Sequence, residues 1–155
     1  MNMKKNKIIK VLIALDYDPL SKKVVEAGYS LAKAMGAEVI LLHVVEDLTV
    51  YSITYLNMGP LQLDSIVELK DVSQEFLEET KLLLGNEAIQ TVIKEGDFAD
   101  CIIETAKEFD VDIIVIGSLS KRWLENIVLG SVSERVMKQT TIPLFIVPTK
   151  KEIDD

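Results

Sequence analysis

The sequence predicts an α/β protein built on a doubly wound, five-stranded parallel sheet with helices on both faces. Short apolar runs alternate along the chain with segments whose hydrophobic residues recur at steps of three and four. This is the pattern of strands followed by amphipathic helices. The apolar runs are nearly continuous, as expected for strands that are covered on both faces and pair in parallel. With right-handed crossovers, and with the most polar strand at one edge, the expected strand order is 3-2-1-4-5.

Each predicted strand is a short run that ends at a charged residue, a glycine or a turn. The five strands span Ile8–Leu15, Glu38–Val45, Ile89–Gly96, Val111–Gly117 and Pro143–Val147. The third strand is more polar than the others, so we place it at the edge beside the second. The last strand then occupies the opposite edge.

Four helices are expected to connect these strands. The first begins at an Asp18-Pro19 cap, since proline is favoured at the first helical position, and it ends at Gly36. Asp97 is expected to cap the third helix. The predicted apolar faces are Leu20, Val24, Ala27, Leu31 and Met35 in the first helix; Ile66, Leu69, Val72, Phe76 and Leu83 in the second, which ends at Gly85; Phe98, Ile102, Ala106 and Phe109 in the third; and Val132, Val136 and Met137 in the fourth.

Length and composition limit the class of protein. With 155 residues, of which 48% are hydrophobic and 27% charged, the chain is expected to form one domain over residues 1–155, with a core at about 7–148 and frayed tails. The formal net charge of −8 disfavours nucleic acid and anionic membrane surfaces as partners. Cys101 is the single cysteine and cannot form an internal disulfide. With no transmembrane run and no cleavable signal, a cytoplasmic protein is predicted.

A ligand crevice is predicted where the first and fourth strands lie side by side. The loops that follow these strands leave in opposite directions, which opens a crevice at the carboxyl ends of the strands. Asp16 and Gly117 lie on its two sides. Asp16 is placed to accept hydrogen bonds from a ribose hydroxyl, and the apolar strand ends at Ala14, Val44 and Ile116 would flank a flat purine.

The stretch GSLSKRWLENIVLGS, residues 117–131, follows the fourth strand. Gly117 lets the backbone approach a ligand closely, and the loop amides can form an anion-binding concavity. Gly130-Ser131 begins a helix whose free N–H groups favour phosphate, so the loop and the crevice together indicate a nucleotide. The residues alone leave an alternative equally open, in which the glycines merely turn the chain and Ser131 merely caps a helix.

This loop and the order of the strands resemble the universal stress protein family. The resemblance is carried by Gly117-Ser118-Leu119-Ser120, nine further residues, then Gly130-Ser131-Val132-Ser133-Glu134-Arg135-Val136, and finally PLFIV. Asp16 and the pieces VILLHVV, EGD and VDIIVIGS follow in the same order, so the resemblance covers almost the whole chain. It implies an adenine nucleotide alpha hydrolase-like fold and the branch of the family that binds ATP through this loop.

The resemblance also implies roles for individual residues. Asp16 corresponds to the residue that holds ribose and adenine, and Val44 to the one whose backbone meets the adenine edge. The family's second loop glycine is replaced by Ser120, so either the backbone tolerates a side chain there or phosphate binding is weakened. The implied ligand is ATP or AMP, with or without Mg²⁺. The candidate phosphate-binding positions are Gly117, Ser118, Ser120, Gly130, Ser131, Val132 and Ser133.

Two functions compete at this point. One is an adenine-nucleotide-binding regulatory or stress-response module, with at most slow ATP hydrolysis because no side chain is clearly placed to orient water. The other is a dimeric stress-associated interaction protein that binds no nucleotide. A phospho-receiver with Asp16, Asp18 and Asp97 around Mg²⁺ is the least favoured class. No catalytic residue and no metal site are predicted, and His43 is expected to be a packed core histidine.

Association between copies is expected through the last strand. An apolar edge strand is a template for pairing, and dimers built this way are common in the resembled family. Pro143–Val147 is therefore predicted to pair with its copy across a two-fold axis. Trp123 and Leu124 either contact another molecule or fold back onto the domain. The long segment 47–65 is expected to be a lid or a docking surface.

Overall fold

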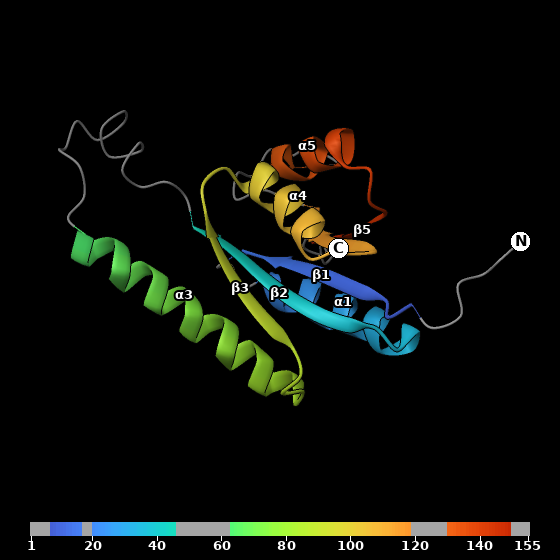
Figure 1. Ribbon diagram of the computed structural model, residues 1–155, viewed down its shortest axis with the longest axis horizontal. Helices are drawn as coiled ribbons and strands as arrows, with labels where there is room; N and C mark the ends of the chain where they lie inside the picture. The colour runs from blue at the N-terminus through green and yellow to red at the C-terminus, as the bar shows by residue number, and fades with distance from the viewer. Residues whose placement is uncertain (1–6, 17–19, 46–62, 119–129, 150–155) are drawn as a thin grey trace, which may run out of the picture.

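The structure is a computed structural model that describes residues 7–16, 20–45, 63–118 and 130–149, with residues 63–69 described by their backbone alone. At its centre is a five-stranded parallel sheet in the order β3-β2-β1-β4-β5. Helices cover both faces of this sheet (Figure 1). The predicted fold class and strand order are therefore confirmed. In the described part of the chain, no helix is long and apolar enough to cross a membrane.

The strands lie close to their predicted positions. They are β1 (Lys10–Leu15), β2 (Glu38–Val45), β3 (Gln90–Glu95), β4 (Ile113–Gly117) and β5 (Leu144–Val147). β2 has the predicted bounds, whereas the other strands lose a residue or two at their ends. β3 and β5 form the two edges, as predicted. The central strands are covered on both faces, which explains why their sequences are apolar throughout.

The helices divide between the two faces of the sheet. α1 (Ser21–Met35) and α3 (Leu63–Leu84) pack on one face, and α4 (Phe98–Glu108) and α5 (Ser131–Gln139) pack on the other. Figure 1 shows α4 and α5 side by side above the sheet, with α3 running along the β3 side. Successive strand residues therefore enter two different cores: Leu12 faces α4 and α5, while Val11 and Ile13 face α1 and α3.

The helical segment of α1 follows Leu20, which has helical dihedrals and no side-chain cap hydrogen bond. Asp18 and Pro19 lie outside the described residues, so the predicted cap there stays a prediction. The helix ends at Gly36 as predicted. Its buried residues are Val24, Val25, Gly28 and Ala32. Of the residues predicted to form the apolar face of this helix, only Val24 is buried.

Two other predicted helix faces are partly wrong. In α3, Val72 is 48% exposed and Leu83 is 86% exposed, whereas Ser73, Leu77 and Thr80 are buried. The polar residues can lie inside because their hydroxyls find partners, as when Thr80 Oγ1 donates to the Phe76 carbonyl at 2.8 Å. In α5, Met137 is likewise 50% exposed, and Val136 carries the apolar contact.

The predicted cap of α4 is confirmed. Asp97 has extended backbone dihedrals, and its carboxylate accepts a hydrogen bond from the Asp100 amide at 3.0 Å. This geometry is that of a helix N-cap, which satisfies one of the amides that the first turn leaves unpaired. Gly96, just before the cap, has a φ of 139°, a conformation that L side chains rarely adopt. The tight turn from β3 into α4 therefore requires a glycine.

Candidate functional site

The helices that are described next after β1 and β4 lie on opposite faces of the sheet. In the pairing of these strands Ile13 lies opposite Val115, so continuing the register places Leu15 level with Gly117. α1 follows β1 and packs on one face, whereas α5, the next described element after β4, packs on the other. In doubly wound proteins, ligands bind at this type of switch point, beyond the carboxyl ends of the strands.

The predicted adenosine-binding residues lie at these strand ends. Asp16 directly follows β1 and is partly buried. Ala14, Val44 and Ile116 all face the core beneath α4 and α5, so the structure brings these three residues to one side of the sheet. The side chains of Val44 and Ile116 are only 5% and 3% exposed. They therefore offer a ligand little side-chain surface, and the predicted role of the Val44 backbone stays a prediction.

Gly117 lies at a point where three segments of the protein pack closely. A Cβ atom at this position would lie 3.1 Å from Thr149 Cγ2 and 3.1 Å from Val24 Cγ2, closer than ordinary van der Waals contact. The absence of a side chain therefore lets β4, α1 and the chain after β5 converge at one point. A structural role for this glycine is present whether or not a ligand also approaches it.

Ser118 is fastened inside the protein by all of its polar groups. Its amide donates to the Val147 carbonyl at 2.9 Å, and its carbonyl accepts from the Gly130 amide at 2.6 Å. Its Oγ accepts from the Thr149 amide at 2.9 Å, and the residue is only 8% exposed. These bonds hold the two ends of the loop together. Direct contact of Ser118 with a ligand stays a prediction.

The residues at the start of α5 differ in what they can offer to a ligand. Gly130 is the N-cap and provides no side-chain hydrogen bond, so the alternative in which Ser131 caps the helix is wrong. Ser133 Oγ donates to the Gly117 carbonyl at 2.6 Å and is buried, while Ser131 is exposed and Val132 partly buried. A helix start without a side-chain cap, with the positive end of the helix dipole, favours an anion.

Several predicted features fall outside the described residues. These are Ser120, Trp123 and Leu124 in the loop after β4, and residues 46–62 of the chain, which include most of the segment 47–65. The predictions about them stay predictions. The last three residues of that segment belong to α3, so the predicted loop is shorter than its sequence indicated.

His43 is a packed core histidine, as expected. It is 8% exposed, and its ring lies edge-on to Phe76 with a centroid distance of 5.9 Å. Its Nδ1 lies 2.8 Å from the Leu15 carbonyl, which can only accept, so Nδ1 carries the hydrogen. His43 thus supports the backbone just before Asp16. Across the described ranges, no cluster of three or more His, Cys, Asp or Glu could hold a metal ion.

Two further interactions near the site were not predicted from the sequence. Thr149 is 3% exposed and bonds to Ser118 at the base of the loop. Arg135, in the second turn of α5, forms ion pairs with Asp97 and Asp100 of the neighbouring helix. The sequence carries no local signal for either interaction, because the partners are 31 and 38 positions apart in the Ser118–Thr149 and Asp97–Arg135 pairs. The ion pairs of Arg135 can be recognised only once α4 is seen to pack against α5.

The strand order and the helices on both faces define an adenine nucleotide alpha hydrolase-like fold. The chain belongs to the universal stress protein family, whose family model matches residues 8–148. Universal stress protein YxiE of Bacillus subtilis is 35% identical over 144 residues, covering 89% of this chain and 97% of that protein. Universal stress protein A of Escherichia coli is 27% identical over 143 residues, with coverages of 92% and 95%.

Solved structures give the same result. The structure of the hypothetical protein MJ0577 has a TM-score of 0.75 at 26% identity and covers 93% of this chain and 98% of its own. A universal stress protein in complex with cAMP has a TM-score of 0.65 at 19% identity, with coverages of 94% and 100%. The second likeness is one of fold alone.

Proposed function

We propose that this protein binds an adenine nucleotide, ATP or AMP, in the crevice between β1 and β4. One juxtaposition carries the proposal: Asp16 follows β1, and the N-terminus of α5, without a side-chain cap, follows the neighbouring strand β4. A carboxylate suits ribose hydroxyls, and a helix N-terminus suits phosphate. Family membership supports it, since a universal stress protein of this fold was solved in complex with cAMP.

In the proposed site, each residue would contact a different part of the nucleotide or hold the loop in place. Asp16 would accept from the ribose, and the backbone of Val44 would meet the adenine edge. The first-turn amides of α5, beginning at Ser131, would meet phosphate. Ser118 and Ser133 are committed to the backbone hydrogen bonds described above, so we assign them to holding the loop. Mg²⁺ would accompany the charge of ATP, and the bound nucleotide would act as a regulatory signal, with hydrolysis at most slow.

The first prediction tests Asp16 by calorimetry. Asp16→Ala should lose a charge-assisted hydrogen bond to ribose, worth on the order of 1.5 to 3 kcal/mol, so affinity for ATP and AMP should fall roughly ten- to a hundred-fold. Glu38→Gln is the matched control, because Glu38 is an exposed carboxylate at the opposite end of the neighbouring strand β2. Equal affinity in the Asp16→Ala variant and the parent would remove Asp16 from the site.

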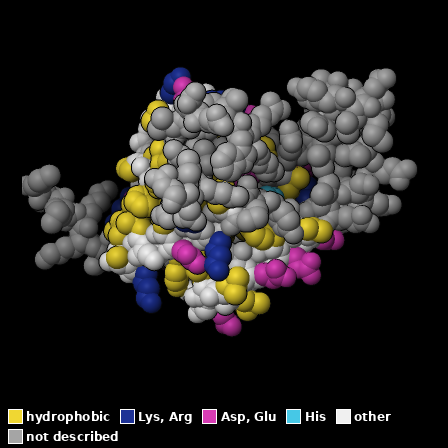
Figure 2. Space-filling model, turned by 180° about the vertical axis from the view of Figure 1, so that it is seen from behind, with side chains coloured by type: hydrophobic (Ala, Val, Ile, Leu, Met, Phe, Trp, Pro, Cys, Tyr) yellow, Lys and Arg dark blue, Asp and Glu magenta, His cyan; other side chains and the backbone are white. Residues whose placement is uncertain are grey.

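A second candidate function is self-association through β5, which is an edge strand. Phe145 on this strand is 39% exposed, and Leu144 and Ile146 are partly buried. Figure 2, which views the molecule from behind, shows exposed hydrophobic side chains at several places on this face. An apolar edge of this kind favours pairing with a second copy, so we propose a homodimer through Pro143–Val147.

The two candidates are compatible, and mass spectrometry of the protein purified without added nucleotide separates them. A copurifying adenine nucleotide supports the binding module. A dimer that carries none and does not bind ATP or AMP on titration supports an interaction protein with an empty crevice. A cytoplasmic location stays a prediction.

A further inference from the structure

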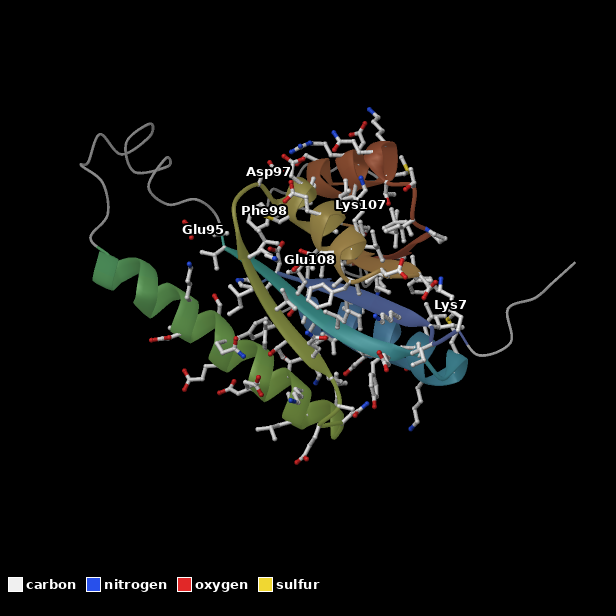
Figure 3. The ribbon with its side chains drawn as sticks, in the orientation of Figure 1. Lys7, Glu95, Asp97, Phe98, Lys107 and Glu108 are labelled. Carbon is white, nitrogen blue, oxygen red and sulfur yellow. The ribbon has the colours of Figure 1, made fainter. Side chains whose placement is uncertain are left out.

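The start of α4 is joined to α5 by one network of charged side chains. Arg135 Nη1 donates to Asp97 Oδ1 at 2.8 Å and lies 3.0 Å from Asp97 Oδ2. Arg135 Nη2 donates to Asp100 Oδ1 at 3.2 Å. Figure 3 shows Asp97 at the start of α4, where the chain arrives from β3, beside α5. One guanidinium thus ties α5 to the N-terminal turn of its neighbour.

This tie matters because α5 is short and its apolar contacts come from two valines. The helix has nine residues; Val136 is fully buried in the core, Val132 packs partly buried against it, and Ser133 is also buried. A helix this short is not stable in isolation, so its direction depends on contacts with the rest of the protein. The Gly130 and Ser133 hydrogen bonds fix its first turn to β4. Beside the apolar contact of Val136, Arg135 adds a polar constraint about one turn further along, through its ion pairs with α4.

Asp97 is itself held firmly, so it can act as a fixed partner. Its carboxylate caps α4 as well as binding Arg135. The turn that precedes it is tied to the sheet, since the Gly96 amide donates to the Val45 carbonyl at 2.9 Å. Partial burial alone would raise the pKa of Asp97, but the hydrogen bonds from the Asp100 amide and from Arg135 outweigh it and hold that pKa below its ordinary value of 3.8.

We infer that Arg135 is a positioning residue for the phosphate end of the nucleotide site: held by Asp97 and Asp100, it sets the direction of the α5 N-terminus without touching the ligand. This inference rests on the proposed nucleotide binding. Its competitor is direct contact between Arg135 and a phosphate. The geometry favours positioning, because two carboxylates already occupy the guanidinium and neutralise its charge.

Titration of ATP and adenosine into Arg135→Gln and Asp97→Asn separates positioning from direct contact. Both ligands need the crevice, but only ATP needs the α5 N-terminus. If Arg135 acts by positioning, each variant should lower the affinity for ATP about three- to ten-fold relative to the affinity for adenosine. The double variant should bind ATP no more weakly than either single variant, because the pair acts as a unit. Asparagine caps helices about as well as aspartate, so Asp97→Asn removes the ion pair and keeps the cap.

The direction in which Asp97→Asn changes the affinity for ATP distinguishes positioning from direct contact. Direct contact predicts unchanged or tighter ATP binding, because the substitution frees the guanidinium and removes a negative charge near the phosphates. Lys138→Gln is the matched control: it removes one positive charge from the same helix and, among the described residues, breaks only the Lys138–Glu134 pair within α5, so the ATP-to-adenosine ratio should not change. Arg135→Lys provides a second variant if Arg135→Gln unfolds, and it should restore part of the ratio.

The outcomes for this inference and for the proposed function can be told apart. A parent protein that binds ATP and adenosine, with the same affinity ratio in Arg135→Gln and Asp97→Asn, overturns the positioning role alone. A parent protein that binds neither ligand overturns the proposed function, and the positioning role with it.

Discussion

At the scale of the residue, Gly117 and Ser118 have roles in the fold that the motif alone did not indicate. A glycine followed by a serine at the end of a strand is consistent with a ligand loop. The structure shows in addition that Thr149, after the last strand, fills the space beside Gly117 and bonds to Ser118. The loop base is therefore built partly by the C-terminal end of the domain, one residue beyond the span that the family model matches.

This packing leads to a prediction for Gly117→Ala. The added methyl group would lie 3.1 Å from atoms of Thr149 and Val24, and both neighbours are β-branched, so neither can move aside easily. Such overpacking should lower the free energy of unfolding by about 1 to 3 kcal/mol. Urea unfolding monitored by circular dichroism measures the loss. If the variant is as stable as the parent, the two neighbours shift without cost and Gly117 is not required by packing.

At the scale of the element, strands were predicted better than helix faces. The burial of β1, β2 and β4 follows directly from their apolar sequences. In α3, by contrast, Leu83 fits the periodic pattern but is exposed, while Thr80 is inside. Spacing assigns every apolar residue to the core, whereas the helix is placed by the whole sheet surface beneath it and can bury a hydroxyl that bonds to its own backbone.

The start of α4 gives a prediction for the pH dependence of stability. Because the pKa of Asp97 is lowered in the folded protein, its ionised form stabilises the fold above the unfolded-state pKa of about 3.9, and this contribution is lost as pH falls through the folded-state pKa. The Asp97 side chain is 45% exposed, so screening limits the contribution to less than about 1 kcal/mol. The free energy of unfolding, measured with urea between about pH 6 and pH 2, should therefore fall less steeply at the acid end in Asp97→Asn than in the parent.

Asp112→Asn provides the comparison for this pH profile. The hydrogen bond from Lys7 and the one from the Lys10 amide lower the pKa of Asp112. In Asp112→Asn the free energy of unfolding should therefore also fall less steeply at acid pH than in the parent. Asp112 bonds to Lys7 and to the Lys10 amide and shares no partner with Asp97. The effects of the two substitutions on the free energy of unfolding should therefore add. A profile of Asp97→Asn that runs parallel to that of the parent would show that the α4 cap does not titrate differently on unfolding.

At the scale of the whole molecule, the sequence predicted the sheet order and the switch point between β1 and β4, because both follow from the alternation of strands and helices. It could not predict the side-chain interactions that hold the segments after β4 in place. Thr149 with Ser118, and Arg135 with Asp97, join residues more than thirty positions apart. Such pairs exist only once the helices are packed, whereas Asp16 and Gly130 stand at strand and helix ends that the sequence itself marks.

The last prediction concerns the edge strand β5 and the assembly of two copies. The parent should sediment as a dimer at micromolar concentration. Phe145→Asp should raise the dissociation constant at least about ten-fold, or about 1.4 kcal/mol, because it would bury a carboxylate beside the paired edge. Leu83→Asp is the matched control: Leu83 is a more exposed hydrophobic residue at the end of α3, away from β5, and its substitution should leave the dimer intact. A parent that sediments only as a monomer contradicts the dimer itself, whereas a Phe145→Asp variant that remains as dimeric as the parent contradicts pairing through β5 and moves the interface elsewhere.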